Sequence, residues 1–139
     1  MNAFFYSLHE ALCRNDCKYF TCPQRCLSAL RNIELLKDMV VLHGSMYSLL
    51  PINFRPQSGD LMILFAANWH ELEQMIAMKD IFDSFRVVLI LGGDEYLSDS
   101  RYHQLRPRFT SSMDMNFIEL ESVVNKMMLV SPDANTQQR

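Results

Sequence analysis

The sequence has no long hydrophobic run and no block of like charge. Its longest apolar run is far too short to cross a bilayer, which takes about 20 apolar residues in a helix. The 16 acidic and 13 basic residues are spread along the chain and leave a formal net charge of -3. Non-specific nucleic-acid binding requires a concentrated basic face, so this balance argues against it. We therefore expect a soluble protein that binds neither a membrane nor a nucleic acid.

Motifs typical of enzymes are also missing from the sequence. No Ser or Cys stands in a G-x-S-x-G elbow, and no histidines form an H-E-x-x-H pair. Gly92-Gly93-Asp94 is too short for a phosphate-binding loop, because two glycines before a helix are ordinary turn chemistry. His70 and Glu71 are expected on a solvated first helical turn, where the helix dipole favours Glu71. We therefore expect no enzymatic activity.

The length of 139 residues is that of one domain with a single core. The apolar fraction of 49% and the charged fraction of 21% are ordinary for a globular protein. Met1 to Tyr6 has no basic lead and too short an apolar run for a signal peptide, so we expect a cytoplasmic protein. The polar, aperiodic segment 131–139 predicts a flexible tail after one domain over 1–130.

The central stretch from Asp60 to Gly93 has the pattern strand, helix, strand. Leu61–Phe65 and Arg86–Leu91 are strand-length segments whose apolar residues do not alternate with polar ones. Such segments predict strands covered on both faces, as in a parallel sheet with helices on each side. From Asn68 to Phe85 the apolar residues recur at three- and four-residue steps, which predicts a helix. Together they predict one right-handed βαβ unit.

Further strands and helices are expected around this unit. The expected strands are Ala3–Ser7, Asp38–Leu42 and Phe109–Ser112. The expected helices are 8–15 with 23–37 as one two-part helix, 46–50, 95–104, and a last helix that follows Asp114 and extends to about Met128. Five strands alternating with five helices predict an α/β fold, namely a doubly wound, five-stranded parallel sheet of flavodoxin-like type in three α/β/α layers.

The order of elements from Met1 to Met128 resembles a response-regulator receiver domain, most closely from Asp60 onward. The resemblance implies a site at the carboxyl edge of the sheet. There, an aspartate that ends the third strand accepts a phosphoryl group beside an acidic pair that holds Mg²⁺ after the first strand. A hydroxyl residue that ends the fourth strand and a lysine that ends the fifth complete the receiver switch.

This sequence departs from the receiver pattern at each of these positions. Ala66 and Ala67 stand where the acceptor carboxylate is expected, and Glu10 alone replaces the acidic pair, which makes a poor Mg²⁺ site. Gly92 ends the fourth strand without a hydroxyl, and Ser111 lies where the lysine is expected. The resemblance therefore implies a degenerate receiver, or pseudo-receiver, that is not phosphorylated.

All four cysteines fall in one short segment, at Cys13, Cys17, Cys22 and Cys26. Their spacing, C-x3-C-x4-C-x3-C, places each outer pair about one helical turn apart, and His9 is in step with the first pair. Four thiolates match the ligand count of tetrahedral zinc or of an iron–sulfur cluster. The alternative is that they are small core residues, since free cysteine is among the most buried residue types. Both interpretations are open.

Aromatic and arginine residues are mixed between Tyr96 and Phe109. Tyr102, Leu105, Arg106 and Arg108 lie over the expected fourth helix and fifth strand, the face by which receiver domains commonly pair or bind targets. Tyrosine and arginine often contribute most of the binding energy of an interface. The alternative is a solvated helix followed by a structural Arg-Pro-Arg turn.

These patterns support three functional hypotheses. The first is a non-enzymatic, receiver-like signalling domain that needs no cofactor and binds another protein or a second copy of itself. The second is a metal or iron–sulfur redox sensor built on the segment from Cys13 to Cys26. A flavodoxin-type or hydrolytic enzyme ranks third, because the sequence shows no assembled site for either.

Overall fold

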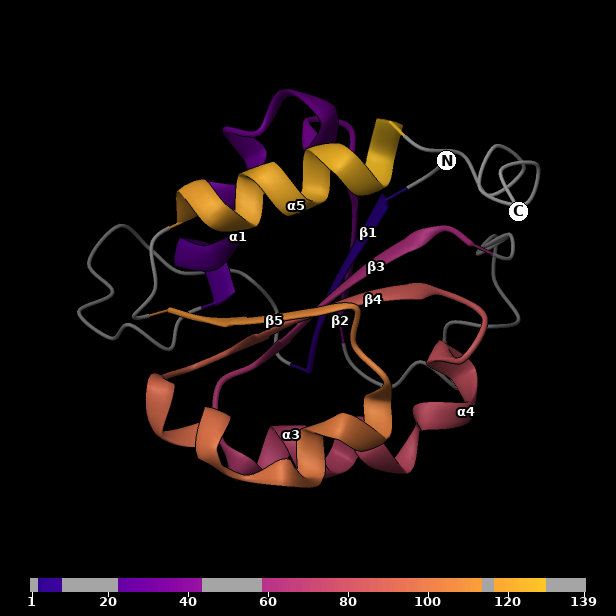
Figure 1. The fold of residues 1–139 in the computed structure, drawn as a ribbon, viewed down its shortest axis with the longest axis vertical. Helices are drawn as coiled ribbons and strands as arrows, with labels where there is room; N and C mark the ends of the chain where they lie inside the picture. The colour runs from indigo at the N-terminus through magenta and orange to yellow at the C-terminus, as the bar shows by residue number, and fades with distance from the viewer. Residues whose placement is uncertain (1–2, 9–22, 44–58, 114–116, 130–139) are drawn as a thin grey trace.

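A parallel five-stranded sheet forms the centre of the molecule (Figure 1). The computed structural model describes residues 3–8, 23–43, 59–113 and 117–129. The strands are β1 (Ala3–Ser7), β2 (Val40–His43), β3 (Leu61–Ala66), β4 (Arg86–Leu91) and β5 (Phe109–Ser112). They follow the order β2-β1-β3-β4-β5 with every pairing parallel. This is the order of a doubly wound, flavodoxin-like sheet, so the predicted fold class is confirmed.

Strands β1, β3 and β4 are buried along their whole length. Successive side chains of a strand point to opposite faces of the sheet, so each of these strands supplies both sides of the core. In β3, for example, Ile63 belongs to one core cluster, and Met62 and Leu64 belong to the other. The unbroken apolar runs in the sequence are explained by this burial on two faces.

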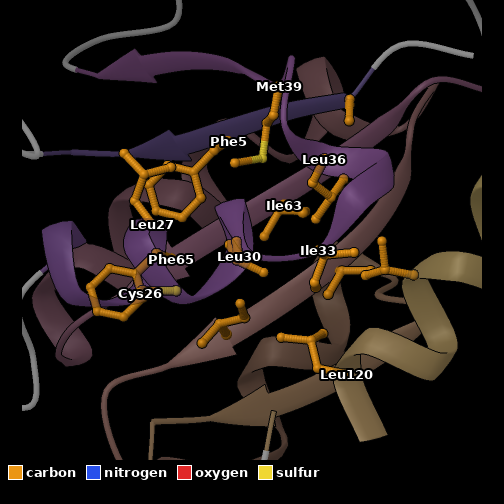
Figure 2. Close-up of a cluster of buried hydrophobic side chains, with 14 of the residues drawn as sticks. Phe5, Cys26, Leu27, Leu30, Ile33, Leu36, Met39, Ile63, Phe65 and Leu120 are labelled. Carbon is orange, nitrogen blue, oxygen red and sulfur yellow. The ribbon is translucent and has the colours of Figure 1, made fainter. Parts of the chain in front are cut away.

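One face of the sheet is covered by α1 (Pro23–Arg31), the 3-10 helix η1 (Glu34–Leu36) and α5 (Phe117–Leu129) (Figure 1). Their apolar residues pack on the sheet in the first core cluster, part of which is shown in Figure 2. The buried members of this cluster are Ala3, Phe5, Cys26, Leu27, Leu30, Ile33, Leu36, Met39, Leu61, Ile63, Phe65, Ala67, Val88, Ile90, Met113, Leu120 and Val124.

The other face is covered by α3 (Trp69–Ala77), α4 (Lys79–Phe82) and the 3-10 helices η2 (Asp94–Ser98) and η3 (Ser100–Leu105) (Figure 1). The second core cluster lies here, and its buried members are Phe4, Tyr6, Met62, Leu64, Ala66, Leu72, Met75, Met78, Phe82, Phe85, Val87, Leu89, Leu91 and Leu105. None of the helices in the described ranges has both the length and the apolar character needed to cross a bilayer.

Several predicted helices differ from those observed. The helix expected over 23–37 ends at Arg31, because Ile33 takes an extended backbone before η1 begins. The helix expected over 68–85 is interrupted at Met78, whose φ of -102° and ψ of 16° separate α3 from α4. The helix expected over 95–104 is instead the pair η2 and η3, because extended Asp99 lies between them.

Strand boundaries agree more closely with the predictions. Ala3–Ser7, Arg86–Leu91 and Phe109–Ser112 have the expected bounds, and β3 extends one residue beyond the expected Leu61–Phe65. The strand expected at 38–42 begins two residues later. The helices expected over 8–15 and 46–50 and the tail at 131–139 fall largely or wholly outside the described residues.

Candidate functional site

The carboxyl ends of the parallel strands meet at one edge of the sheet, which is where flavodoxin-like folds bind their ligands. Three of the four predicted degenerate positions, Ala66, Ala67 and Gly92, lie together at this edge. Ala66 ends β3, and its carbonyl oxygen accepts a hydrogen bond of 2.9 Å from the Gly92 amide. The fourth position, Ser111, is buried on β5 and pairs with Ile90 of β4. The structure therefore places these positions at the ends of β3 and β4 and on the neighbouring strand β5.

Gly92 is held against the backbone that follows β3. A Cβ atom added at Gly92 would overlap the carbonyl oxygen of Ala67 and lie 2.9 Å from its carbonyl carbon. No side chain fits there unless one backbone segment moves. Close packing of two strand ends explains this glycine, and the same packing leaves no room for a side chain of any kind at this position.

Glu71 in the first turn of α3 is buried, with 4% of its surface exposed, so the prediction of a solvated Glu71 is wrong. Its Oε1 accepts a hydrogen bond of 3.1 Å from the Ala67 amide, and the side chain of the N-cap Asn68 accepts one from the Glu71 amide. This exchange is a variant of the capping box: Asn68 satisfies the amide of Glu71, three positions later, while Glu71 satisfies the amide of Ala67, the residue before the cap. The Asn-x-x-Glu spacing in the sequence was the signal for it.

Asp94 follows β4 and joins the start of η2 to the end of β5. Its Oδ1 accepts a short hydrogen bond from the Ser112 hydroxyl, and Ser112 is almost fully buried. Glu71 and Asp94 thus both make hydrogen bonds that hold the carboxyl edge together. Within the described ranges, no three His, Cys, Asp or Glu side chains are grouped closely enough to hold a metal ion. His9 and Glu10, which follow β1, lie outside those ranges.

Cys26 is the one predicted metal ligand that falls on described residues. It lies on α1, is fully buried and packs in the first core cluster with Leu30 and Phe65 (Figure 2). Burial raises the pKa of the Cys26 thiol well above its ordinary value, because an apolar environment disfavours the thiolate. At Cys26, therefore, the surroundings favour a core thiol. The other proposed ligands, Cys13, Cys17, Cys22 and His9, lie outside the described residues.

The predicted interface residues do not all face solvent. Arg106 and Arg108 are exposed and Tyr102 is half-buried. Leu105, however, is only 3% exposed and packs in the second core cluster, so it is not available to a partner. The last residue of η3 is thus an anchor for the helix, and the candidate interface is reduced to Tyr102, Arg106 and Arg108.

A cluster around Arg101 ties η2 and η3 to α3, and sequence reasoning missed it. The Arg101 guanidinium stacks over the Trp69 ring at 4.5 Å and forms a 2.6 Å ion pair with Glu73. It also pairs with Asp99, and this hydrogen bond lowers the pKa of the Asp99 carboxyl. Tyr96 packs edge-on against Trp69. Because 28 positions separate Arg101 from Glu73, no local sequence pattern marks the pair.

No family model matches this chain, and neither a curated protein nor a solved structure matches it. Its function must therefore be inferred from its own residues and their arrangement.

Proposed function

We propose that this protein is a cytoplasmic, receiver-like signalling domain that binds another protein, or a second copy of itself, without phosphorylation and without enzymatic activity. The observation that carries the proposal is the packing at the carboxyl edge of β3 and β4. Buried Ala66 and Ala67 replace the phosphoacceptor of a receiver, and Gly92 lies against the Ala67 carbonyl group. The nearby carboxylates of Glu71 and Asp94 accept hydrogen bonds from the Ala67 amide and the Ser112 hydroxyl, and these bonds stabilise the packing.

The surface formed by η3 and the start of β5 supports a binding role. Its exposed and half-buried residues include Tyr102, Arg106 and Arg108, which are of the types that often contribute most to interface energy. The buried side chain of Leu105 and the ion pairs of Arg101 fix η3 on the body of the domain. A surface fixed in this way loses little conformational entropy when it binds a partner.

Two measurements test the proposal. Incubation with acetyl phosphate and Mg²⁺ should leave the intact mass of the protein unchanged, whereas a stable phosphoryl adduct would contradict the proposal. A photo-crosslinking amino acid at exposed Gln104 on η3 should form a defined protein adduct in cells that express the protein. The matched control is the same amino acid at exposed Glu121 on α5, on the opposite face of the sheet. Equal adducts from both positions, or none from Gln104, would refute a specific binding surface on η3.

A further inference from the structure

Arg106 and Arg108 flank Pro107 in the connection from η3 to β5, at the amino edge of the sheet. Both are exposed, and no carboxylate in the described part of the chain pairs with either. The neighbouring Arg101, by contrast, is paired with Glu73 and Asp99. From Ser100 to Met113 the sequence contains no acidic residue. The connection therefore presents two positive charges that no carboxylate of the described ranges neutralises, on a chain whose net charge is -3.

The backbone of this connection is fixed. The Arg106 amide donates a hydrogen bond of 2.9 Å to His103, and the Arg108 amide donates one of 2.7 Å to Val87 on β4. The first closes the end of η3, and the second attaches the connection to the sheet. Both guanidinium groups therefore extend from an anchored segment, which suits them to recognise a ligand of matching geometry.

Arg106 has an unfavourable backbone conformation, with φ 51° and ψ 50°. Among the described residues it is the only one other than glycine with a positive φ. Glycine or asparagine adopts this left-handed conformation more readily than arginine does, and the following Pro107 restricts Arg106 further. An arginine at this position therefore costs stability. Its side chain is more readily explained by binding than by folding.

A second cation, Arg86, lies near Arg108. Arg86 at the start of β4 is buried, and its Nη1 donates a hydrogen bond of 3.1 Å to the carbonyl oxygen of Met127 in α5. Burial, and after it the charge of nearby Arg108, lowers the pKa of Arg86. Arg86 and Arg108 repel each other, and an anion bound at Arg108 would reduce this repulsion.

We propose that Arg106 and Arg108 are the docking site for an acidic segment of a partner protein. Arginine binds carboxylates through paired, charge-assisted hydrogen bonds, so two acidic side chains of one segment would match the two guanidinium groups. A nucleic acid is a poorer match, because two arginines neutralise only about two phosphates and the chain as a whole is acidic. This inference rests on the proposed function and adds the chemistry of the partner.

The test uses a short, fluorescein-labelled peptide of consecutive glutamates and measures its anisotropy as full-length protein is added. The double variant Arg106→Asn/Arg108→Gln should bind it about tenfold more weakly than the wild type. The control Arg31→Gln/Lys37→Gln removes the same charge from α1 and the residue after η1, and should bind as the wild type does. No peptide binding to the wild type, an equal loss in the control, or tighter binding of an oligonucleotide of equal length would overturn the proposal.

Two further measurements distinguish a loss of the acidic docking site from a loss of folding and from a failure of the proposed function. Arg106→Asn alone should unfold at the wild-type temperature or above it, because asparagine tolerates the left-handed conformation. The Gln104 crosslink should be lost in the double variant. Persistence of that adduct at the wild-type yield would refute the acidic docking site and leave the proposed function standing. Peptide binding by the wild type without any Gln104 adduct in cells would refute the proposed function and leave the preference of Arg106 and Arg108 for acidic segments standing.

Discussion

The guanidinium of Arg86, at the first position of β4, donates a hydrogen bond of 3.1 Å to the carbonyl oxygen of Met127 in the last turns of α5. The final carbonyls of a helix have no partner within the helix and carry partial negative charge, so a buried cation stabilises them. Arg86→Met should lower the free energy of unfolding by about 1–3 kcal/mol, measured by urea denaturation. Arg31→Met in the exposed last turn of α1 is the control and should change it by less than about 0.5 kcal/mol.

Gly92 is expected to be intolerant of any side chain. Gly92→Ala places a Cβ atom on the Ala67 carbonyl group, and the backbone shift that follows should cost about 1–3 kcal/mol of stability. Neighbouring Gly93 has an extended backbone, with φ -167° and ψ 164°, which alanine also adopts. Gly93→Ala therefore serves as the control. Equal stability of the two variants in thermal unfolding would show that Gly92 and Ala67 are not in close contact.

The buried carboxylate of Glu71 should contribute through its hydrogen bond to the Ala67 amide. Glu71→Ala leaves that buried amide without its acceptor and should cost about 1–3 kcal/mol. Glu71→Gln retains an acceptor oxygen, as glutamine does in a capping box, and should cost less. Hydrogen exchange at the Ala67 amide is the decisive measurement. It should accelerate strongly in Glu71→Ala and weakly in Glu71→Gln, and equal rates would contradict the role given to the side chain.

Stability should decline at alkaline pH because of Tyr6. Burial raises the pKa of the Tyr6 phenol from 10.0 to about 12. The folded state therefore retains a proton that the unfolded state releases, so the stabilisation is complete below about pH 10 and is lost as the pH rises toward about 12. Urea unfolding of the wild type and of Tyr6→Phe on both sides of about pH 10 checks this. The wild type should lose stability more steeply with pH than the variant, and parallel curves would rule out the effect.

Cys26 is expected to be a core thiol. In the native protein it should react with iodoacetamide far more slowly than in urea, because burial disfavours the reactive thiolate. Peptide mapping by mass spectrometry separates its modification from that of the other cysteines. Cys26→Ala should leave the zinc and iron content of anaerobically purified protein unchanged. A stoichiometric metal that is lost in this variant would instead support the metal or iron–sulfur sensor.

The sequence alone determined the layered architecture. The unbroken apolar residues of Leu61–Phe65 and Val87–Leu91 indicated strands covered on both faces, and the helical pattern between them favoured a parallel sheet with helices on each side. The same reasoning located the ends of β1, β4 and β5, because turn residues and changes of pattern mark them. It also singled out Ala66, Ala67 and Gly92, which the structure places at the ends of β3 and β4.

The tertiary structure decided which side chains are buried and which are available. Glu71 and Leu105 have the local patterns of a solvated turn and of an interface, yet both are buried, because α3 and η3 pack on the same face of the sheet. The contact between Gly92 and Ala67 depends on the register of β3 and β4, which no local pattern specifies. The left-handed backbone of Arg106 is likewise set by the tertiary structure, because Arg106 lies in the turn that joins η3 to β5. The periodicity of apolar residues reports only their spacing along the chain. Whether a given side chain is buried depends on which other helices and strands pack over it.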